Sequence, residues 1–244
     1  MKKVLLIIVA LLIATSALAT PPSKILVKYD VYGGYGMAVI DALKAKWSAA
    51  TITSYQGSTW GAFDNALRTG TWNIVIVEAH NYTSSSTSHY TNLASWYNRH
   101  IGPLFYTDWG ASGSYNNVLE TAMGAGNPTR LAMPPRPHYA WVTTHAICTG
   151  ITNWTYGHPS GYTTGGSAYP WTTATPVTGW TSTLQAGQGG IMVAPDKHSV
   201  ISGYFPSLNT TQARKLWANI LGFMWTGSTS VKPESLGKVK ALYK

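Results

Sequence analysis

Along the first half of the chain, short apolar runs take turns with segments in which apolar residues recur every three or four positions. Short apolar runs rich in β-branched residues predict strands over residues 24–29, 51–55, 72–78 and 104–107. Between and after them, apolar residues recur every three or four positions, which predicts helices over residues 36–47, 59–69, 89–100 and 114–123. Strands that alternate with helices favour a parallel sheet covered on both faces.

The run WNIVIVE at residues 72–78 is the strongest strand signal. It is apolar at nearly every position, so we expect it in the centre of the sheet, buried on both faces. Ser58 or Thr59 is expected to cap the helix that follows the second strand, and Gly70 to end it.

The second half of the chain is less regular. Residues 126–190 contain most of the prolines and show no helical period, although residues 137–151 look partly extended. Residues 189–205 alternate around Pro195 and Asp196, which predicts a β-hairpin. Asn209 or Thr210 is expected to cap a last helix that ends at Gly227. These patterns predict one α/β domain of flavodoxin-like type, a three-layer sandwich with a mostly parallel sheet and a late β-hairpin.

The two ends of the chain differ from this domain. Lys2 and Lys3 precede an apolar run at residues 4–14, and Ala17-Leu18-Ala19 resembles a cleavage site with small residues at its first and third positions. Residues 1–19 are therefore expected to be a signal peptide. The run is too short for a membrane span, and no later segment is apolar for long enough. We therefore expect a secreted protein (periplasmic, extracellular or on the cell surface), with its domain over residues 20–229 and a basic tail over residues 230–244.

Charge and cysteine content narrow the function classes. The net charge of +9 falls to about +4 for the body once the two signal lysines and the tail are set aside, and the remaining charges form no basic cluster. Nucleic-acid binding is therefore not expected. The single cysteine, Cys148, cannot form an intramolecular disulfide, and we expect it to be a buried, inert thiol.

Three features together resemble the class I glutamine amidotransferase-like superfamily, in its secreted, trehalose-utilisation-type branch. They are the strand–helix alternation with a sharp turn after the fourth strand, the segment HAICTGI at residues 145–151, and the closing pattern over residues 189–225. The resemblance implies that His145 lies in a structural turn. The glutaminases of that superfamily carry a nucleophilic cysteine at the turn, where this chain has Asp108, Trp109 and Gly110. The downstream His-x-Glu pair is also missing, so glutaminase activity is not expected.

Polar residues are expected at the carboxyl ends of the parallel strands, where such sheets bind ligands. This edge should collect the candidate ligand-binding residues Asp30, Tyr32, Gln56 and Trp109 and the candidate catalytic residues Glu78, His80 and Asp108. Glu78 and His80 lie two apart in an extended segment and project to the same side. With Asp108 they could form a carboxylate–imidazole–carboxylate set; alternatively, these carboxylates cap helices or bind loop N–H groups. No spacing typical of a metal or cofactor site accompanies them, so neither group is expected.

Two function classes remain open. The first is a non-catalytic, exported domain that acts at the cell surface and binds polysaccharide or a surface protein. The second is a secreted hydrolase that uses Glu78, His80 and Asp108 on a carbohydrate or peptide-like substrate. Trp109 is expected to fill the cleft or to offer its ring face to a sugar. Most of the other aromatic residues in the irregular half are expected to pack into the core, namely Trp154, Tyr156, Tyr162, Tyr169, Trp171 and Trp180.

Overall fold

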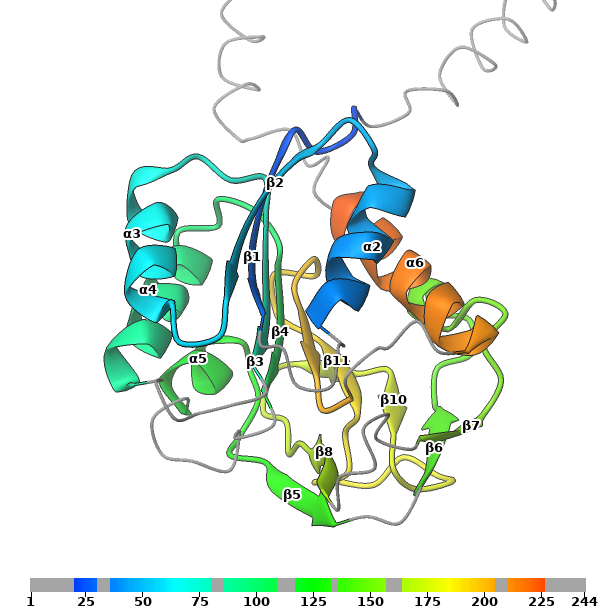
Figure 1. Cartoon of the computed structure of the whole chain (residues 1–244). Helices are drawn as coiled ribbons and strands as arrows, with labels where there is room; N and C mark the ends of the chain where they lie inside the picture. The colour runs from blue at the N-terminus through cyan, green and yellow to red at the C-terminus, as the bar shows by residue number, and fades with distance from the viewer. Residues whose placement is uncertain are drawn as a thin grey trace, which may run out of the picture.

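A central sheet organises the chain. The computed structural model describes residues 20–29, 36–79, 86–108, 117–132, 136–156, 164–204 and 210–226 (Figure 1). Seven strands form this sheet in the order β2-β1-β3-β4-β12-β11-β9. The first five in that order pair in parallel, whereas β11 pairs antiparallel with β12 and with β9. The strands are β2 (Thr51–Gln56), β1 (Lys24–Tyr29), β3 (Ile74–Ala79), β4 (Leu104–Asp108), β12 (Val200–Ser202), β11 (Ile191–Val193) and β9 (Thr175–Pro176).

Strand β3 lies in the centre of the sheet, as the sequence predicted. It pairs in parallel with β1 and β4, and all six of its residues are buried. It begins two residues later than expected, although the backbone N–H of Asn73 still donates to the carbonyl of Lys24 at 2.9 Å. The side chains of Trp72 and Asn73 add further bonds. The Trp72 indole donates to the carbonyl of Ala66 in the preceding helix, and the Asn73 side-chain oxygen accepts from the backbone N–H of Ser23 and of Lys24.

Helices cover both faces of the sheet (Figure 1). Helices α3 (Trp60–Thr69), α4 (Thr87–Asn98) and α5 (Asn117–Ala122) lie on one side, here called the α3–α5 face. Helices α2 (Gly36–Lys46) and α6 (Thr211–Thr226) lie on the other, the α2/α6 face. Each face has its own hydrophobic cluster, because alternate residues of the fully buried strands point to opposite sides. In the described part of the chain, no helix combines the length and the apolar character needed to cross a bilayer.

The structure corrects the expected N-cap of helix α3 and confirms that of helix α6. Thr59 occupies the N-cap position of α3, but its hydroxyl donates backward to the carbonyl of Gln56 at 2.8 Å and does not accept a helix N–H. Thr210 does act as expected, since its hydroxyl accepts the N–H of Ala213 at 3.1 Å at the start of α6. Gly70 ends α3, with an extended backbone.

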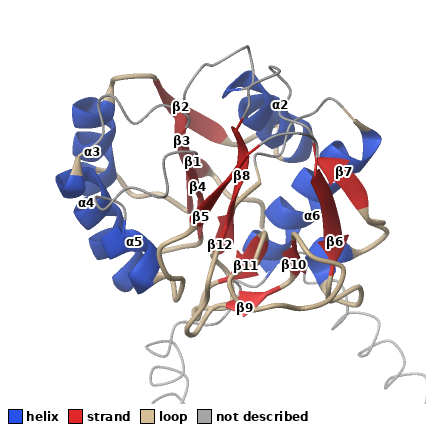
Figure 2. Cartoon of the chain, turned by 90° about the horizontal axis from the view of Figure 1, so that it is seen from below, coloured by secondary structure: helices blue, strands red, loops and turns tan. Residues whose placement is uncertain are grey.

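The irregular half of the chain forms small sheets near the carboxyl ends of the parallel strands. Strands β10, β6 and β7 form one sheet, and β5 pairs with β8 in a ribbon that lies below the central sheet in Figure 1 and in front of it in Figure 2. These strands are only two to five residues long, too short for their periodicity to stand out in the sequence. Their bounds are β5 (Thr129–Ala132), β6 (Arg136–Ala140), β7 (Trp154–Tyr156), β8 (Thr164–Ala168) and β10 (Thr178–Gly179).

Candidate functional site

A row of polar side chains crosses the carboxyl edge of the sheet on the α2/α6 face. The strand register aligns Tyr29 with Glu78, Glu78 with Thr107, and Thr107 with Ser202, so the four residues stand side by side on β1, β3, β4 and β12. All four are buried, at 7%, 1%, 0% and 0% exposure. The Thr107 hydroxyl has no hydrogen-bond partner in the described part of the chain. The Ser202 hydroxyl, in contrast, donates to the carbonyl of Tyr204 and accepts its N–H. The row is a candidate floor for a ligand site because it lies at the carboxyl ends of the parallel strands, where such sheets bind ligands.

The opposite face of the same edge holds a buried carboxyl–phenol cluster. Asp108, at the end of β4, is 1% exposed, and its Oδ2 accepts hydrogen bonds from the phenols of Tyr90 at 2.5 Å and Tyr106 at 3.5 Å. Glu120 of α5 is fully buried nearby, and Tyr169 donates to its Oε1 at 3.5 Å.

These neighbours change the ionisation of Glu120. Burial, and then the charge of Asp108, raise the pKa of Glu120 to about 9, so its carboxyl keeps its proton at neutral pH. Burial, reinforced by Asp108 and Glu120, also holds the pKa of Tyr106 well above its usual value. The cluster is therefore a set of proton-bearing groups around the Asp108 carboxylate.

The structure does not bring Glu78 and Asp108 together. Glu78 is aligned with Thr107, and Asp108 with Ala79, one residue further along. Because successive side chains of a strand point to opposite faces, Glu78 belongs to the α2/α6 face and Asp108 to the α3–α5 face. His80 lies outside the described residues. The two carboxylates of the expected carboxylate–imidazole–carboxylate set therefore lie on opposite faces of the sheet.

Of the expected ligand-binding residues, only Gln56 is described. It is the last residue of the edge strand β2, it is exposed, and its carbonyl accepts the Thr59 hydroxyl. Asp30, Tyr32 and Trp109 lie outside the described residues, as does Gly110 of the turn after β4.

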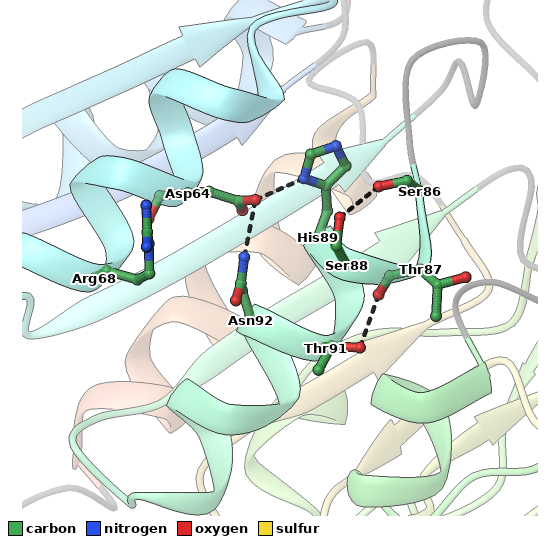
Figure 3. A network of polar contacts seen from close by, with 8 residues as sticks. All are labelled: Asp64, Arg68, Ser86, Thr87, Ser88, His89, Thr91 and Asn92. Carbon is green, nitrogen blue, oxygen red and sulfur yellow. Dashed lines mark hydrogen bonds and ion pairs between the residues drawn. The ribbon is translucent and has the colours of Figure 1, made fainter.

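Sequence reasoning missed an aspartate–histidine pair between α3 and α4 (Figure 3). Asp64 Oδ2 lies 2.6 Å from His89 Nδ1 and accepts a hydrogen bond from Asn92 at 3.0 Å. The imidazole stacks on Trp60, with ring centroids 5.0 Å apart, and the Lys28 ammonium lies 4.8 Å from the centroid of the same Trp60 ring.

The Asp64 carboxylate favours a proton on Nδ1 of His89 and leaves Nε2 as the acceptor nitrogen. This is the arrangement of a histidine prepared for proton transfer. Asp64 and His89 are 25 positions apart on different helices, so no local spacing in the sequence could reveal the pair.

Two residues of the irregular half have the structural roles that the sequence suggested. His145 precedes a short 3-10 helix, η2 (Ala146–Cys148), and its Nδ1 accepts the N–H of Ile147. Cys148 is 1% exposed, and burial raises the pKa of its thiol to about 11, which makes it unreactive at neutral pH.

The aromatic residues described in this half mainly pack the core. Tyr169 and Trp180 are buried, and Trp154 and Trp171 pack against the two clusters. Among them lies His138, another residue that sequence reasoning missed. It is fully buried, it stacks on Trp154 at 4.4 Å, and burial lowers its pKa to about 3, so its ring is neutral.

Comparisons with known proteins identify this chain only through its fold. No protein-family model and no curated protein matches the sequence. A ThuA-like protein from Bacteroides uniformis superposes with a TM-score of 0.54 and 10% sequence identity, over 86% of this chain and 94% of that one. The chain shares the fold of a ThuA-like protein. This agrees with the amidotransferase-like class that the sequence resembles.

A second neighbour is a much longer chain. The β-galactosidase from Bacillus circulans sp. alkalophilus superposes with a TM-score of 0.52 and 10% identity, over 83% of this chain. The superposed region is 30% of that enzyme's length. The fold of this chain thus also occurs as one part of a larger protein.

Proposed function

We propose that this chain is an exported, non-catalytic amidotransferase-like domain, a flavodoxin-like three-layer sandwich that binds glycans at the cell surface. Secretion rests on the signal-like residues 1–19, and the class rests on the shared fold.

The observation that carries the non-catalytic part is the state of Asp108. It stands at the end of β4, next to the turn where the amidotransferases that this chain resembles carry their nucleophile. Its carboxylate is buried and accepts two phenolic hydrogen bonds, from Tyr90 and Tyr106. A carboxyl group held in this way is shielded from an incoming substrate, and its Oδ2 is already occupied by two phenols, so it is a poor nucleophile and a poor base.

Glycan binding is supported by the polar residues at the carboxyl edge of the central sheet and by one structural neighbour. The row Tyr29, Glu78, Thr107 and Ser202 lies at this edge, and its Thr107 hydroxyl, which has no partner in the described part of the chain, is a group of the kind that binds sugar hydroxyls. One structural neighbour is a part of a β-galactosidase, an enzyme named for a carbohydrate substrate.

A glycan array, run beside a broad hydrolase screen, tests this proposal on the wild-type protein and on Asp108→Asn. We expect glycan binding and no turnover, with Asp108→Asn folded and unchanged in binding. Circular dichroism establishes that the variant is folded. If the wild type hydrolyses a substrate and a folded Asp108→Asn protein does not, the non-catalytic assignment is refuted. If no glycan on the array is bound, the proposed class of ligand is refuted.

One observation favours the second candidate, a secreted hydrolase. The Asp64–His89 pair holds an imidazole with its tautomer set, and His89 retains 15% of its side-chain exposure. In this reading His89 is the general base and Asp64 the residue that orients it, in place of the expected set of Glu78, His80 and Asp108.

The pair His89→Gln and His100→Gln tests this alternative in the same hydrolase screen. His100 is an exposed histidine that follows α4 and serves as the matched control. If His89 is the general base, only His89→Gln loses activity. In addition, Asp64→Asn should shift the pH dependence of the activity. Equal activity of both variants would show that His89 takes no part in the hydrolysis.

A further inference from the structure

A groove lies between helices α2 and α6 and is lined mostly by exposed residues of the two helices. Its cavity has a volume of about 370 Å³ and is lined by Asp41, Ala42, Ala45, Lys46, Arg214 and Ala218. The two helices lie side by side in Figure 1 and contact each other. Three alanines face the space between them, and their small side chains leave it hollow where larger residues would fill it.

The groove contains two cationic side chains and one carboxylate, so it has a net positive charge. Lys46 from α2 and Arg214 from α6 both line the cavity, and neither is ion-paired with a described carboxylate. Lys46 and Arg214 are exposed residues, but the Lys46 ammonium lies 5.8 Å from the centroid of the Trp47 ring, and its partial burial lowers its pKa. A bound anion would offset the desolvation of this ammonium group.

Size and wall chemistry narrow the class of ligand. Pockets that hold small molecules have volumes of about 300–1,000 Å³, so this groove suits one small molecule. Methyl groups form much of its wall and suit an apolar body. Asp41 cancels one of the two positive charges, which favours a singly charged anion over phosphate or a dicarboxylate.

We propose that the α2/α6 groove binds a small organic monoanion, a carboxylate attached to a compact apolar body. The carboxylate is held by Lys46 and Arg214, and the apolar body packs on Ala42, Ala45 and Ala218. This site is separate from the carboxyl edge of the sheet, and it stands whether or not that edge binds glycans.

Nuclear magnetic resonance of the purified protein with ¹³C-labelled alanine methyl groups tests the site directly. Benzoate and hexanoate are the probes, benzyl alcohol is the neutral analogue, and glucuronate carries the same charge on a polar body. We expect saturable shifts of the Ala42, Ala45 and Ala218 methyl groups with benzoate or hexanoate, and much weaker ones with the other two. The methyl of Ala66 on α3, far from the groove in sequence and on the other face, should not move.

Two double variants separate the groove from the general charge of the protein. Lys46→Gln with Arg214→Gln removes both cations of the groove. Lys44→Gln with Lys215→Gln removes the same charge from exposed positions on the same two helices that do not line the cavity. The first should weaken benzoate binding by at least about tenfold, the scale of one charge-assisted hydrogen bond, and the second should have little effect.

Ala45→Leu keeps every charge and fills the hollow, so it should abolish binding in a protein that remains folded. Asp41→Asn should tighten it. The proposal is overturned if benzoate shifts none of the three methyl groups, if both double variants weaken binding equally, or if benzyl alcohol binds as well as benzoate. Preferential binding of glucuronate would overturn the apolar-body assignment and point to a sugar acid instead.

Discussion

The side chain of Glu120 is fully buried beside Asp108, and its pKa is about 9 in the folded protein, against 4.5 for an ordinary glutamate. Above pH 4.5 an unfolded chain releases this proton, whereas the folded protein keeps it. The folded state is therefore progressively destabilised as the pH rises from about 4.5 to about 9, by at most about 1.4 kcal/mol per pH unit.

Glu120→Gln removes this penalty, because the amide is neutral at every pH and has nearly the same shape. We expect the variant to match the wild type near pH 4 and to have a higher free energy of unfolding at pH 8, measured by denaturant titration at several pH values. Asp41→Asn, at an exposed position, serves as the control for the loss of a carboxyl. A Glu120→Gln protein that is less stable at pH 8 would show that the carboxyl, in its ionised form, supports the fold.

At the scale of elements, Gly203 marks the closest approach between the central sheet and the β5–β8 ribbon. Its carbonyl accepts the N–H of Ser167 on β8 at 2.9 Å, and its own N–H donates to Gly190 at 2.7 Å. A Cβ atom at Gly203 would lie 1.8 Å from the carbonyl oxygen of Ser167, a backbone atom that cannot move alone. Only glycine allows the end of β12 to pass this close to β8.

Gly203→Ala should therefore lower the free energy of unfolding by about 2 kcal/mol or more, as overpacking does in closely packed interiors. Gly61→Ala is the matched comparison. A Cβ there would have no heavy atom within 4 Å, so the helical position should gain about 0.5–1 kcal/mol. Thermal and denaturant unfolding measure both. Equal stability of Gly203→Ala and the wild type would mean that the ribbon can separate from β12 at little cost.

At the scale of the whole molecule, protection from solvent is concentrated in the middle of the sheet. Strands β3 and β4 are fully buried and paired on both sides, whereas β2 is a half-exposed edge strand paired only with β1. We expect amide hydrogen exchange to be slowest in β3 and β4 and faster in β2 and in the β6–β7 pair. Exchange followed by mass spectrometry or by nuclear magnetic resonance measures this order. Equal protection of β2 and β3 would contradict it.

The sequence alone determined the nature and the order of the main elements. The apolar runs at 24–29, 72–78 and 104–107 and the helical spacing between them carry their own periodicity, which depends only on residues close together in the chain. The same local information indicated a mostly parallel sheet with β3 inside it and the unreactive Cys148, whereas the family resemblance implied the structural turn at His145. The short strands of the irregular half were missed because two to five residues contain too little of a period.

Only the tertiary structure decided which of these residues meet. The register between β3 and β4 differs by one residue from the alignment that would have put Glu78 and Asp108 on one face, and a shift of one residue changes the face of every side chain. Helix docking, not sequence spacing, joined Asp64 to His89 and placed the cavity-lining alanines of α2 and α6 around a common hollow. Register and docking depend on the packing of segments far apart in the chain, which a local pattern does not contain.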